Sequence, residues 1–435
     1  MFGHTRPEIP WRAAKKRKIG LVLRALLLEN VHPNSVEILR KAGFDVETRS
    51  GALDEAELIE ALEGVHVLGI RSKTQVTAKV IEARPELLAI GAFSIGTNQI
   101  DLAAASSFGV AVFNAPYSNT RSVVELALAE TIGLTRRIAD YDRALHAGVW
   151  DKTADGAHEV RGRTLGIVGY GNIGSQLSVL AENLGMRVVF YDLAEKLSLG
   201  NAQRMNSLEE LLEISDAVTL HVDGRQSNRG FFGAEQFSQM KPGAIFLNLS
   251  RGFVIDVEAL RDALESGHLS GAAVDVFPSE PKKRGDSFDS PLRGLKNVIL
   301  SPHVGGSTEE AQRAIGEFVA TKLRDYLATG STMLSVNLPN LQLQAKDTTG
   351  RIMLLHRNVP GVMAAVNQVF AEHGANIEAQ MLATQGDIGY VVTDISDVTR
   401  RGSSNEIMAM DTTIRLRIHD AYNRDEFPIG PAAGK

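Results

Sequence analysis

From residue 19 onward, short apolar runs alternate with stretches in which apolar residues recur at helical spacing. Each apolar run is followed by turn-forming or amphipathic sequence, an alternation typical of βαβ units and a parallel sheet. The runs predict an α/β fold with two sets of strands, the second of which forms a doubly wound sheet. We place the strands at residues 65–70, 87–93 and 110–114, and then at 164–169, 186–192, 217–222, 244–250, 272–277 and 298–303.

Three helices connect or follow these strands. A first helix is predicted over residues 34–41, a long one over 122–147 and a third over 309–327, because apolar residues recur there with a period of about 3.6 residues. The stretch 328–350 is polar and turn-rich and has no apolar period. It is therefore predicted to be a linker.

The last part of the chain predicts a small α+β module with βαββαβ order. A strand is followed by a helix that begins at Pro360 and closes at Gly374. The strands are expected at residues 352–357, 376–384, 388–395 and 412–418. The polar run 400–404 and a short stretch at 406–410 take the place of the second helix, and residues 419–435 are expected to form a tail.

Composition limits the class of protein. Of 435 residues, 44% are hydrophobic and 23% are charged, which excludes bulk disorder and fibrous repeats. The chain has no cysteine, which excludes disulfides, thiolate metal sites and cysteine nucleophiles and fits a reducing cytoplasm. No apolar run reaches the length of about 18 residues that a membrane span needs. The N-terminus also lacks a signal-peptide pattern, so we expect no membrane partner. No bound metal is expected either.

The charge balance of the chain argues against a nucleic-acid partner. The chain carries 46 basic and 52 acidic residues, a net charge of −6, which argues against a basic binding surface over the whole molecule. The first 18 residues are an exception, since they contain a basic cluster next to two prolines. We expect residues 1–18 to form a disordered tail, with a targeting or anion-binding arm as the alternative.

Residues 169–174 (GYGNIG) match G-x-G-x-x-G between a predicted strand and a helix. Gly169 allows a tight turn, Gly171 lets the backbone approach a pyrophosphate, and Gly174 lets the helix pack on the strand. The helix, expected to start at Ser175, offers unpaired amides to phosphates. This context favours a dinucleotide site over the alternative, a glycine turn that binds nothing.

Asp192 ends the next predicted strand, 18 residues after Gly174. That spacing is close to the roughly 20 residues expected for an acidic ligand of the ribose. A carboxylate there accepts hydrogen bonds from the ribose hydroxyls and repels a 2′-phosphate. The sequence therefore favours NAD over NADP as cofactor.

Three ionisable residues, Arg251, Glu280 and His303, each follow a later predicted strand. Ligands of open α/β sheets bind at the carboxyl ends of strands, so we expect the three on one rim. An arginine can hold a carboxylate through two parallel hydrogen bonds. A histidine can pass a proton to or from a hydroxyl, and a neighbouring glutamate fixes its tautomer. Although most of the 11 histidines are expected to be structural, this joint placement predicts catalysis.

The chain resembles the D-isomer-specific 2-hydroxyacid dehydrogenases over roughly residues 19–396. The motifs that carry the resemblance are residues 169–174, 250–252 (SRG), 275–281 and 301–306 (SPHVGG). Three further segments, and the order of the domains, are similar to the branch of that family that acts on D-3-phosphoglycerate. These segments are residues 69–74 (GIRSKT), 95–101 (IGTNQID) and 113–123 (FNAPYSNTRSV).

The resemblance implies NAD-dependent oxidation of 3-phosphoglycerate to 3-phosphohydroxypyruvate, the first step of serine biosynthesis. It makes His303 the acid/base, Glu280 its partner and Arg251 the ligand of the substrate carboxylate. The family often has arginine where this chain has Lys73, so a phosphate contact there would be a point charge rather than a fork. The residues implied to help hold the substrate are Arg71, Ser72 and Asn119.

The implied fold has two doubly wound parallel-sheet domains. An NAD-binding Rossmann domain spans residues 119–305, and a flavodoxin-like substrate-binding domain spans residues 19–118 and 306–348. The chain would cross between them near Asn119 and Gly306, which suits hinge closure over the substrate. The residues implied to bind NAD are Gly169, Gly171, Asn172, Ile173, Gly174, Asp192, Leu249, Ser250, Arg251, Asp275, His303, Gly305 and Gly306.

Residues 349–418 resemble an ACT domain, a regulatory α+β module. His356, Asn358 and Asn376 resemble its serine-binding positions, and amide and imidazole groups suit a zwitterionic amino acid such as L-serine. We expect the strand ends that carry these residues to lie near each other, and a paired module to join the sites of two copies. The alternative is that these polar residues only close strand and helix ends.

Other functions fit parts of the same sequence. A 2-hydroxyacid dehydrogenase acting on glycerate, lactate or 2-hydroxyglutarate would carry the same motifs. An NAD-sensing interaction protein would keep the fold without turnover, although the joint presence of the three ionisable residues argues against it. An amino-acid-binding regulator explains only the C-terminal module. Because ACT modules usually pair, we expect a homodimer or homotetramer, with Trp150 as a subunit contact or a core residue.

Overall fold

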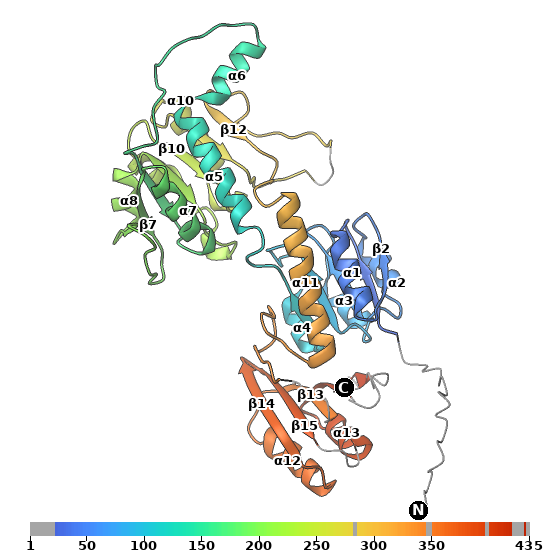
Figure 1. The fold of residues 1–435 in the computed structure, drawn as a ribbon. Coiled ribbons are helices and arrows are strands. Elements are labelled where there is room, and N and C mark those ends of the chain that lie inside the picture. The colour runs from blue at the N-terminus through green and yellow to red at the C-terminus, as the bar shows by residue number, and fades with distance from the viewer. Residues whose placement is uncertain (1–21, 282–284, 345–349, 396–399, 420–429, 432–435) are drawn as a thin grey trace, which may run out of the picture.

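The computed structural model describes residues 22–281, 285–344, 350–395, 400–419 and 430–431. They form an N-terminal, a central and a C-terminal lobe, each built on one sheet (Figure 1). The expected tail at residues 1–18 lies outside the described residues. No helix in the described ranges is long and apolar enough to cross a bilayer.

The N-terminal lobe contains a five-stranded parallel sheet in the order β2-β1-β3-β4-β5, which is the flavodoxin-like order. Its inner strands are buried along their length because helices cover both faces. Helix α11 lies so close to the sheet that a side chain at Gly91 would strike Val319 and Leu323. The elements are β1 (Arg24–Leu27), α1 (Pro33–Lys41), β2 (Asp45–Thr48), α2 (Glu55–Ala61), β3 (Val67–Ile70), α3 (Ala78–Ala83), β4 (Ala89–Ala92), α4 (Leu102–Ser107), β5 (Ala111–Phe113) and α11 (Glu309–Thr329).

The central lobe contains a seven-stranded parallel sheet in the order β12-β11-β10-β9-β6-β7-β8. The order reverses between β6 and β9, where open α/β sheets bind their ligands. All six strands predicted for this lobe are present, and the short β8 extends one edge. The elements are α5 (Thr120–Thr135), α6 (Ile138–His146), β6 (Thr164–Val168), α7 (Asn172–Asn183), β7 (Arg187–Tyr191), β8 (Gln203–Arg204), α8 (Leu208–Ile214), β9 (Ala217–Leu220), α9 (Ala234–Gln239), β10 (Ile245–Asn248), α10 (Val257–Glu265), β11 (Gly271–Val274) and β12 (Val298–Leu300).

The long helix predicted over residues 122–147 is two helices, α5 and α6. Arg137 between them has a left-handed backbone with φ of 55°, which a continuous right-handed helix cannot contain. Its guanidinium donates to the carbonyl of Asp155 (3.0 Å) and to Asp140 Oδ2 (3.1 Å), so the break is held by side-chain bonds. Helix α6 buries none of its residues and projects at the end of the central lobe away from the other lobes (Figure 1).

The C-terminal lobe is an antiparallel sheet in the order β14-β15-β13-β16-β17 with two helices, and its first six elements follow the predicted βαββαβ order. Strand β17 pairs with β16, so the prediction that residues 419–435 form a separate tail is partly wrong. The elements are β13 (Gly350–Arg357), α12 (Val362–Glu372), β14 (Ile377–Gln385), β15 (Ile388–Ile395), α13 (Arg400–Met408), β16 (Thr413–His419) and β17 (Gly430–Pro431).

The second helix of this lobe, α13, is present, so the prediction that other sequence replaces it is wrong. Gly402 allows α13 to lie against α12, because a side chain at that position would meet the imidazole of His373. Ser403 is fully buried. Ile407 packs in the apolar core of the lobe with residues of α12, but the other buried positions described in α13 are serines. The apolar period of this helix is therefore weak in the sequence.

Three arginines join the C-terminal lobe to the N-terminal lobe. Arg415 donates to the carbonyl of Leu87 (2.7 Å), and Arg417 donates to that of Leu327 near the end of α11 (2.9 Å). Arg351 donates to the carbonyl of the last residue of the same helix (2.8 Å). The last carbonyls of a helix lack partners within it and attract cations, so Arg351 and Arg417 fasten the module to α11.

Candidate active site

The three candidate catalytic residues lie at the carboxyl ends of neighbouring strands. Strands β10, β11 and β12 are adjacent in the central sheet, and Arg251, Glu280 and His303 follow them in that order. Arg251 lies close enough to Glu280 and His303 for its charge to act on both side chains. The structure therefore brings the three residues together on one rim.

His303 and Glu280 form a close pair. His303 Nδ1 lies 2.9 Å from Glu280 Oε2 and 3.1 Å from Oε1. This hydrogen bond raises the pKa of His303 more than burial lowers it. Burial acts to raise the pKa of Glu280, but His303 and the backbone amide of Phe277 bring it below the ordinary value. Glu280 is therefore anionic at neutral pH and leaves Nε2 of His303 to exchange a proton.

A buried carboxylate, Asp275, holds the loop that carries His303. Asp275 Oδ1 accepts from Ser301 Oγ (2.6 Å) and the Val304 amide (2.8 Å), and Oδ2 accepts from the Gly305 amide (2.8 Å). The loop places His303 in a left-handed backbone with φ of 54°, which these bonds stabilise. Asp275, expected to bind cofactor, therefore also positions the histidine.

Arg251 lies between the two lobes and is flanked by glycines from both. A Cβ at Gly96 of the N-terminal lobe would lie 3.6 Å from the guanidinium, and one at Gly224 would lie 3.3 Å from it. Gly252 permits a further close approach, since a Cβ there would overlap the backbone of Phe277. Burial lowers the pKa of Arg251, but arginine stays cationic in proteins. The guanidinium is thus a partly buried cation at the place where the two lobes meet.

A cavity of about 630 Å³ lies beside the His303–Glu280 pair. Lys73 reaches its wall from the N-terminal lobe, while His303 and Glu280 come from the central lobe. Phe288 and Arg293 belong to the rest of its lining. A substrate in this cavity would lie between an ammonium group and the proton-transfer pair.

The glycine motif forms the cradle that the sequence predicts. Gly169 has φ of 93°, and a side chain there would strike the backbone of His221. A side chain at Gly174 would strike the carbonyl of Gly169, whereas the space at Gly171 is open. Helix α7 begins at Asn172, before the predicted start at Ser175, and Gly171 is its N-cap residue. No side chain caps this helix start. Its first amides can therefore face a phosphate.

Asp192 lies across from this cradle at the end of β7. Its Oδ2 accepts from the Tyr170 amide (2.8 Å) and its Oδ1 from the Ala194 amide (2.9 Å). These bonds orient the carboxylate beside the glycine motif. The cradle, the uncapped helix start and the carboxylate together fit the phosphates and a ribose of NAD.

The other expected cofactor residues lie on neighbouring strand ends. Leu249 and Ser250 are buried after β10, and Gly305 is bound to Asp275. Asn172 and Ile173 are the first two residues of α7. Among the described residues, no group of three or more histidine and acidic side chains is arranged to hold a metal ion.

The chain crosses between the N-terminal and central lobes twice, and the crossings touch. Asn119 precedes α5 and lies against Gly306, where a side chain would overlap it. Ser122 Oγ and Thr308 Oγ1 are 2.8 Å apart. The two crossings therefore lie side by side, with Asn119 at the point where the lobes join.

Arg71, Ser72 and Lys73 lie in the loop after β3. The backbone amides of Ser72 and Lys73 donate to Glu29 Oε2, at 3.1 and 3.0 Å. These amides are already used, so the side chains of the loop remain for a substrate. Of these three residues, Lys73 is the one that lines the cavity.

Two buried polar residues near the site carried no sequence signal. Glu130 of α5 is 3% exposed, and neither of its carboxylate oxygens has a hydrogen-bond partner among the described residues. Burial, helped by the charge of Asp275, raises the pKa of Glu130 to about 8. Burial lowers the pKa of His221, after β9, to about 4. Both are therefore neutral near pH 7. The one hint in the sequence is that an ionisable residue stands on an apolar helix face or at the end of an apolar strand. The glycines Gly96 and Gly224 were missed as well.

The expected effector residues do not meet within one chain. Strands β13 and β14 are parallel to each other, because both pair antiparallel with β15. His356 lies opposite Gly389, whereas Ile377, next to Asn376, lies opposite Ile395 at the other end of the sheet. At about 3.4 Å per residue the two positions are roughly 20 Å apart. The expectation that these strand ends are neighbours is wrong, since α12 returns the chain to the start of the sheet.

His356 and Asn358 are held by local contacts. His356 is 2% exposed, its Nδ1 lies 2.9 Å from the Arg357 carbonyl, and its Nε2 has no hydrogen-bond partner among the described residues. The Asn358 side-chain amide donates to the carbonyl of Gly386 (3.0 Å). Asn358 thus closes the turn between β14 and β15 in this chain.

Comparison with known proteins agrees with this geometry. Residues 128–305 match the NAD-binding domain of D-isomer-specific 2-hydroxyacid dehydrogenases, and residues 352–415 match an ACT domain like that of the AHAS small subunit. The chain also aligns with a solved structure of D-2-hydroxyisocaproate dehydrogenase, with a TM-score of 0.65 and 27% identity over 72% of this chain and 100% of that one.

Curated relatives cover nearly the whole chain. D-3-phosphoglycerate dehydrogenase of Haemophilus influenzae is 48% identical over 397 residues, and that of Escherichia coli K12 is 49% identical over 400. Each alignment spans 91% of this chain and 97% of the relative. The NAD-binding domain and the ACT domain are therefore parts of one known architecture, and this chain belongs to the D-3-phosphoglycerate dehydrogenases of the D-isomer-specific 2-hydroxyacid dehydrogenase family.

Proposed function

We propose that this chain oxidises 3-phosphoglycerate to 3-phosphohydroxypyruvate with NAD, the first step of serine biosynthesis. The observation that carries the proposal is the His303–Glu280 pair in the wall of a cavity that Lys73 enters from the opposite lobe. The name of the curated relatives supports the choice of substrate. We place the reaction in the cytoplasm, whose reducing conditions fit a chain without cysteine.

In the oxidation direction, His303 Nε2 accepts the proton of the C2 hydroxyl group. Glu280, bound to Nδ1, keeps the lone pair on Nε2 and stabilises the imidazolium that forms. The oxygen retains the electrons of the O–H bond and forms the C2 carbonyl, while the hydrogen on C2 leaves as a hydride. NAD, bound at the glycine cradle, supplies the hydride acceptor.

Arg251 and Lys73 bind opposite ends of the substrate. The guanidinium holds the carboxylate through two parallel hydrogen bonds, and the ammonium of Lys73 faces the phosphate as a point charge. Because Arg251 lies against Gly96 of the other lobe, a bound substrate draws the lobes together. Bending at the Asn119–Gly306 hinge then excludes water during hydride transfer.

A substrate panel tests this proposal against its alternatives. The purified chain is given NADH with 3-phosphohydroxypyruvate, hydroxypyruvate, pyruvate or 2-oxoglutarate, and the loss of NADH absorbance is followed. We expect the highest kcat/KM with 3-phosphohydroxypyruvate. A preference for another 2-oxo acid would make the chain a different 2-hydroxyacid dehydrogenase, and NADH binding without turnover of any of them would make it an NAD-sensing protein.

L-Serine is the effector that we propose for the C-terminal lobe. The match to an ACT domain supports an amino-acid ligand. His356 and Asn358 lie at one end of the sheet and Asn376 at the other, so a two-fold pair of modules could place Asn376 of a second copy beside His356 and Asn358. Serine bound there would contact both copies.

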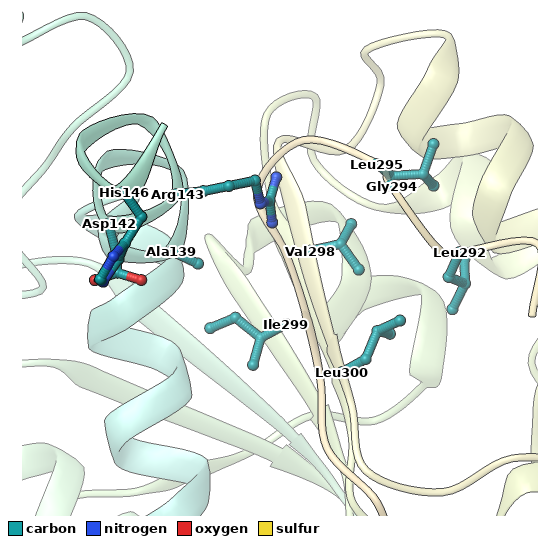
Figure 2. Close-up of a pocket in the computed structure, with 10 residues that line it drawn as sticks. All are labelled: Ala139, Asp142, Arg143, His146, Leu292, Gly294, Leu295, Val298, Ile299 and Leu300. Atoms are coloured by element: carbon teal, nitrogen blue, oxygen red, sulfur yellow. The ribbon is translucent and has the colours of Figure 1, made fainter. Parts of the chain in front are cut away.

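Pairing through the central lobe is the second part of the assembly that we propose, as a homodimer or a homotetramer. Apolar side chains on and after α6 are exposed, among them Leu145 at 55% and Trp150 at 80%. A crevice of about 530 Å³ lies between α6 and the segment 292–300, with Arg143 pointing across it (Figure 2). A second copy would cover these apolar side chains. Light scattering of Trp150→Ala should then show a smaller assembly.

A further inference from the structure

We propose that Glu29 is a positioning residue for the substrate phosphate: its carboxylate holds the loop 71–74 so that Lys73 faces the active site. The inference rests on the function proposed above. It starts from three hydrogen bonds between one buried side chain and three consecutive backbone amides.

Glu29 follows β1 and points at the loop after β3. Its Oε2 accepts from the amides of Ser72 (3.1 Å) and Lys73 (3.0 Å), and its Oε1 accepts from that of Thr74 (2.8 Å). The residue is 8% exposed and has a left-handed backbone with φ of 61°. A non-glycine residue adopts that conformation at a cost, which these three bonds offset.

The location of Glu29 in the sheet explains why this matters for function. Strands β1 and β3 are neighbours at the point where the strand order of the N-terminal lobe reverses. In doubly wound sheets this point is where a ligand binds, and consecutive backbone amides there form a natural anion site. Here the carboxylate of the chain itself takes the amides. An incoming anion therefore meets the side chains of the loop and not its backbone.

Gln99 fixes the same loop from the other side. Its side-chain amide donates to the backbone carbonyl of Arg71. The backbone carbonyl of Gln99 accepts from the backbone amide of Val76 (2.8 Å). The loop is thus tied through its amides by Glu29 and through its ends by Gln99. Lys73, between these ties, lines the cavity that contains His303. Losing the Glu29 bonds would free the loop and misplace the ammonium of Lys73.

The main test compares Glu29→Gln with wild type on two 2-oxo acids, 3-phosphohydroxypyruvate and hydroxypyruvate, which lacks the phosphate. Glutamine keeps the size, but its NH₂ group would face an amide donor and cannot accept. We expect KM for 3-phosphohydroxypyruvate to rise by about tenfold or more, as for a displaced binding group. KM for hydroxypyruvate, kcat and the Kd of NADH should change little.

Glu86→Gln is the matched control. Glu86 also accepts a backbone amide in this lobe, that of Gly64 (3.1 Å), but at the amino ends of the strands. It should leave both KM values unchanged. The double variant Glu29→Gln/Lys73→Gln should bind 3-phosphohydroxypyruvate no worse than Lys73→Gln alone, because Glu29 acts through Lys73.

An unchanged KM for 3-phosphohydroxypyruvate in folded Glu29→Gln would overturn the proposal, as would equal KM increases for both 2-oxo acids. If Glu29→Gln does not fold, Glu29→Asp, whose shorter side chain reaches fewer amides, takes its place with the same criteria. Should wild type reject 3-phosphohydroxypyruvate, the proposed function fails separately. The inhibition constant of inorganic phosphate against the accepted 2-oxo acid then decides: weaker inhibition of Glu29→Gln than of wild type supports the loop role, and equal inhibition rejects it.

Discussion

The N-terminal and central lobes share one architecture but present different groups to a ligand. Each contains a parallel sheet whose strand order reverses once. At the reversal point of the central lobe, Gly171 is open and α7 starts without a capping side chain. At the corresponding point of the N-terminal lobe, Glu29 already occupies the amides of the loop after β3. In the central lobe a ligand can bind backbone amides, whereas in the N-terminal lobe it can bind the side chains of the loop.

The difference indicates how the two ligands are told apart. A dinucleotide carries a diphosphate that any exposed row of amides would bind. With the amides of the 71–74 loop filled by Glu29, the central lobe keeps the backbone anion site near the cleft. In the function proposed above, the substrate is selected by the point charge of Lys73 and the planar guanidinium of Arg251. Predictions that change one lobe at a time test this division.

The largest effect is expected from removing the proton carrier of the central lobe. His303→Ala should lower kcat by about 10²–10⁴-fold, because the variant lacks Nε2, the atom that accepts the hydroxyl proton. NADH binding should survive, since the glycine cradle is untouched. Steady-state kinetics and NADH titration check both parts. A variant that keeps more than half of the wild-type kcat would contradict the assignment.

The next effect separates the two cofactors. Asp192→Ala should raise KM for NAD and reduce discrimination against NADP by about tenfold or more, because both the ribose acceptor and the negative charge are lost. KM for 3-phosphoglycerate should change little, since Asp192 follows β7 beside the cofactor cradle of the central lobe. The ratio of kcat/KM for NAD and NADP measures this. An unchanged ratio would exclude Asp192 from selecting the cofactor.

The central lobe was largely predictable from sequence, and the N-terminal reversal point was not. Buried parallel strands are continuous apolar runs, and the glycine motif and Asp192 are local signals with known spacing. The Glu29 contact joins residues 29 and 72–74, and an acidic residue after a strand resembles a solvated one in sequence. Tertiary burial, not local pattern, makes it functional.

The helix errors have the same origin. The break at Arg137 depends on bonds to Asp140 and Asp155, which no apolar period records. Helix α13 buries Ser403, Ser404 and Ile407, of which only Ile407 is apolar, so its apolar signal is weak. Asn376 lies far from His356 because α12 returns the chain to the start of the sheet, so that β14 runs parallel to β13. Each case required the three-dimensional neighbour.

A smaller effect is expected from the C-terminal lobe, where ligand and active site are coupled at a distance. L-Serine should inhibit turnover, and inhibition should weaken at least about tenfold in Asn358→Ala, with uninhibited turnover little changed. The bonds of Arg415 and Arg417 to the N-terminal lobe give the restraint a physical route. Inhibition curves test the variant. Calorimetry that finds no serine binding to the intact protein at millimolar concentration would leave the lobe as an assembly domain.

The smallest effect is expected in the pH dependence of kcat/KM. The hydrogen bond that His303 donates to Glu280 raises the pKa of His303 above its ordinary value of 6.5. Oxidation needs neutral His303, so its kcat/KM should rise as pH increases through that pKa. Reduction needs the imidazolium, so its kcat/KM should fall over the same range. In Glu280→Gln the main cause of the elevation is gone, and both midpoints should move to lower pH, besides any loss of rate. Glu86→Gln, far from the rim, should leave the midpoints in place. Midpoints in Glu280→Gln that stay fixed or move upward would mean that the titration belongs to another group, such as the buried Glu130, whose pKa is raised to about 8.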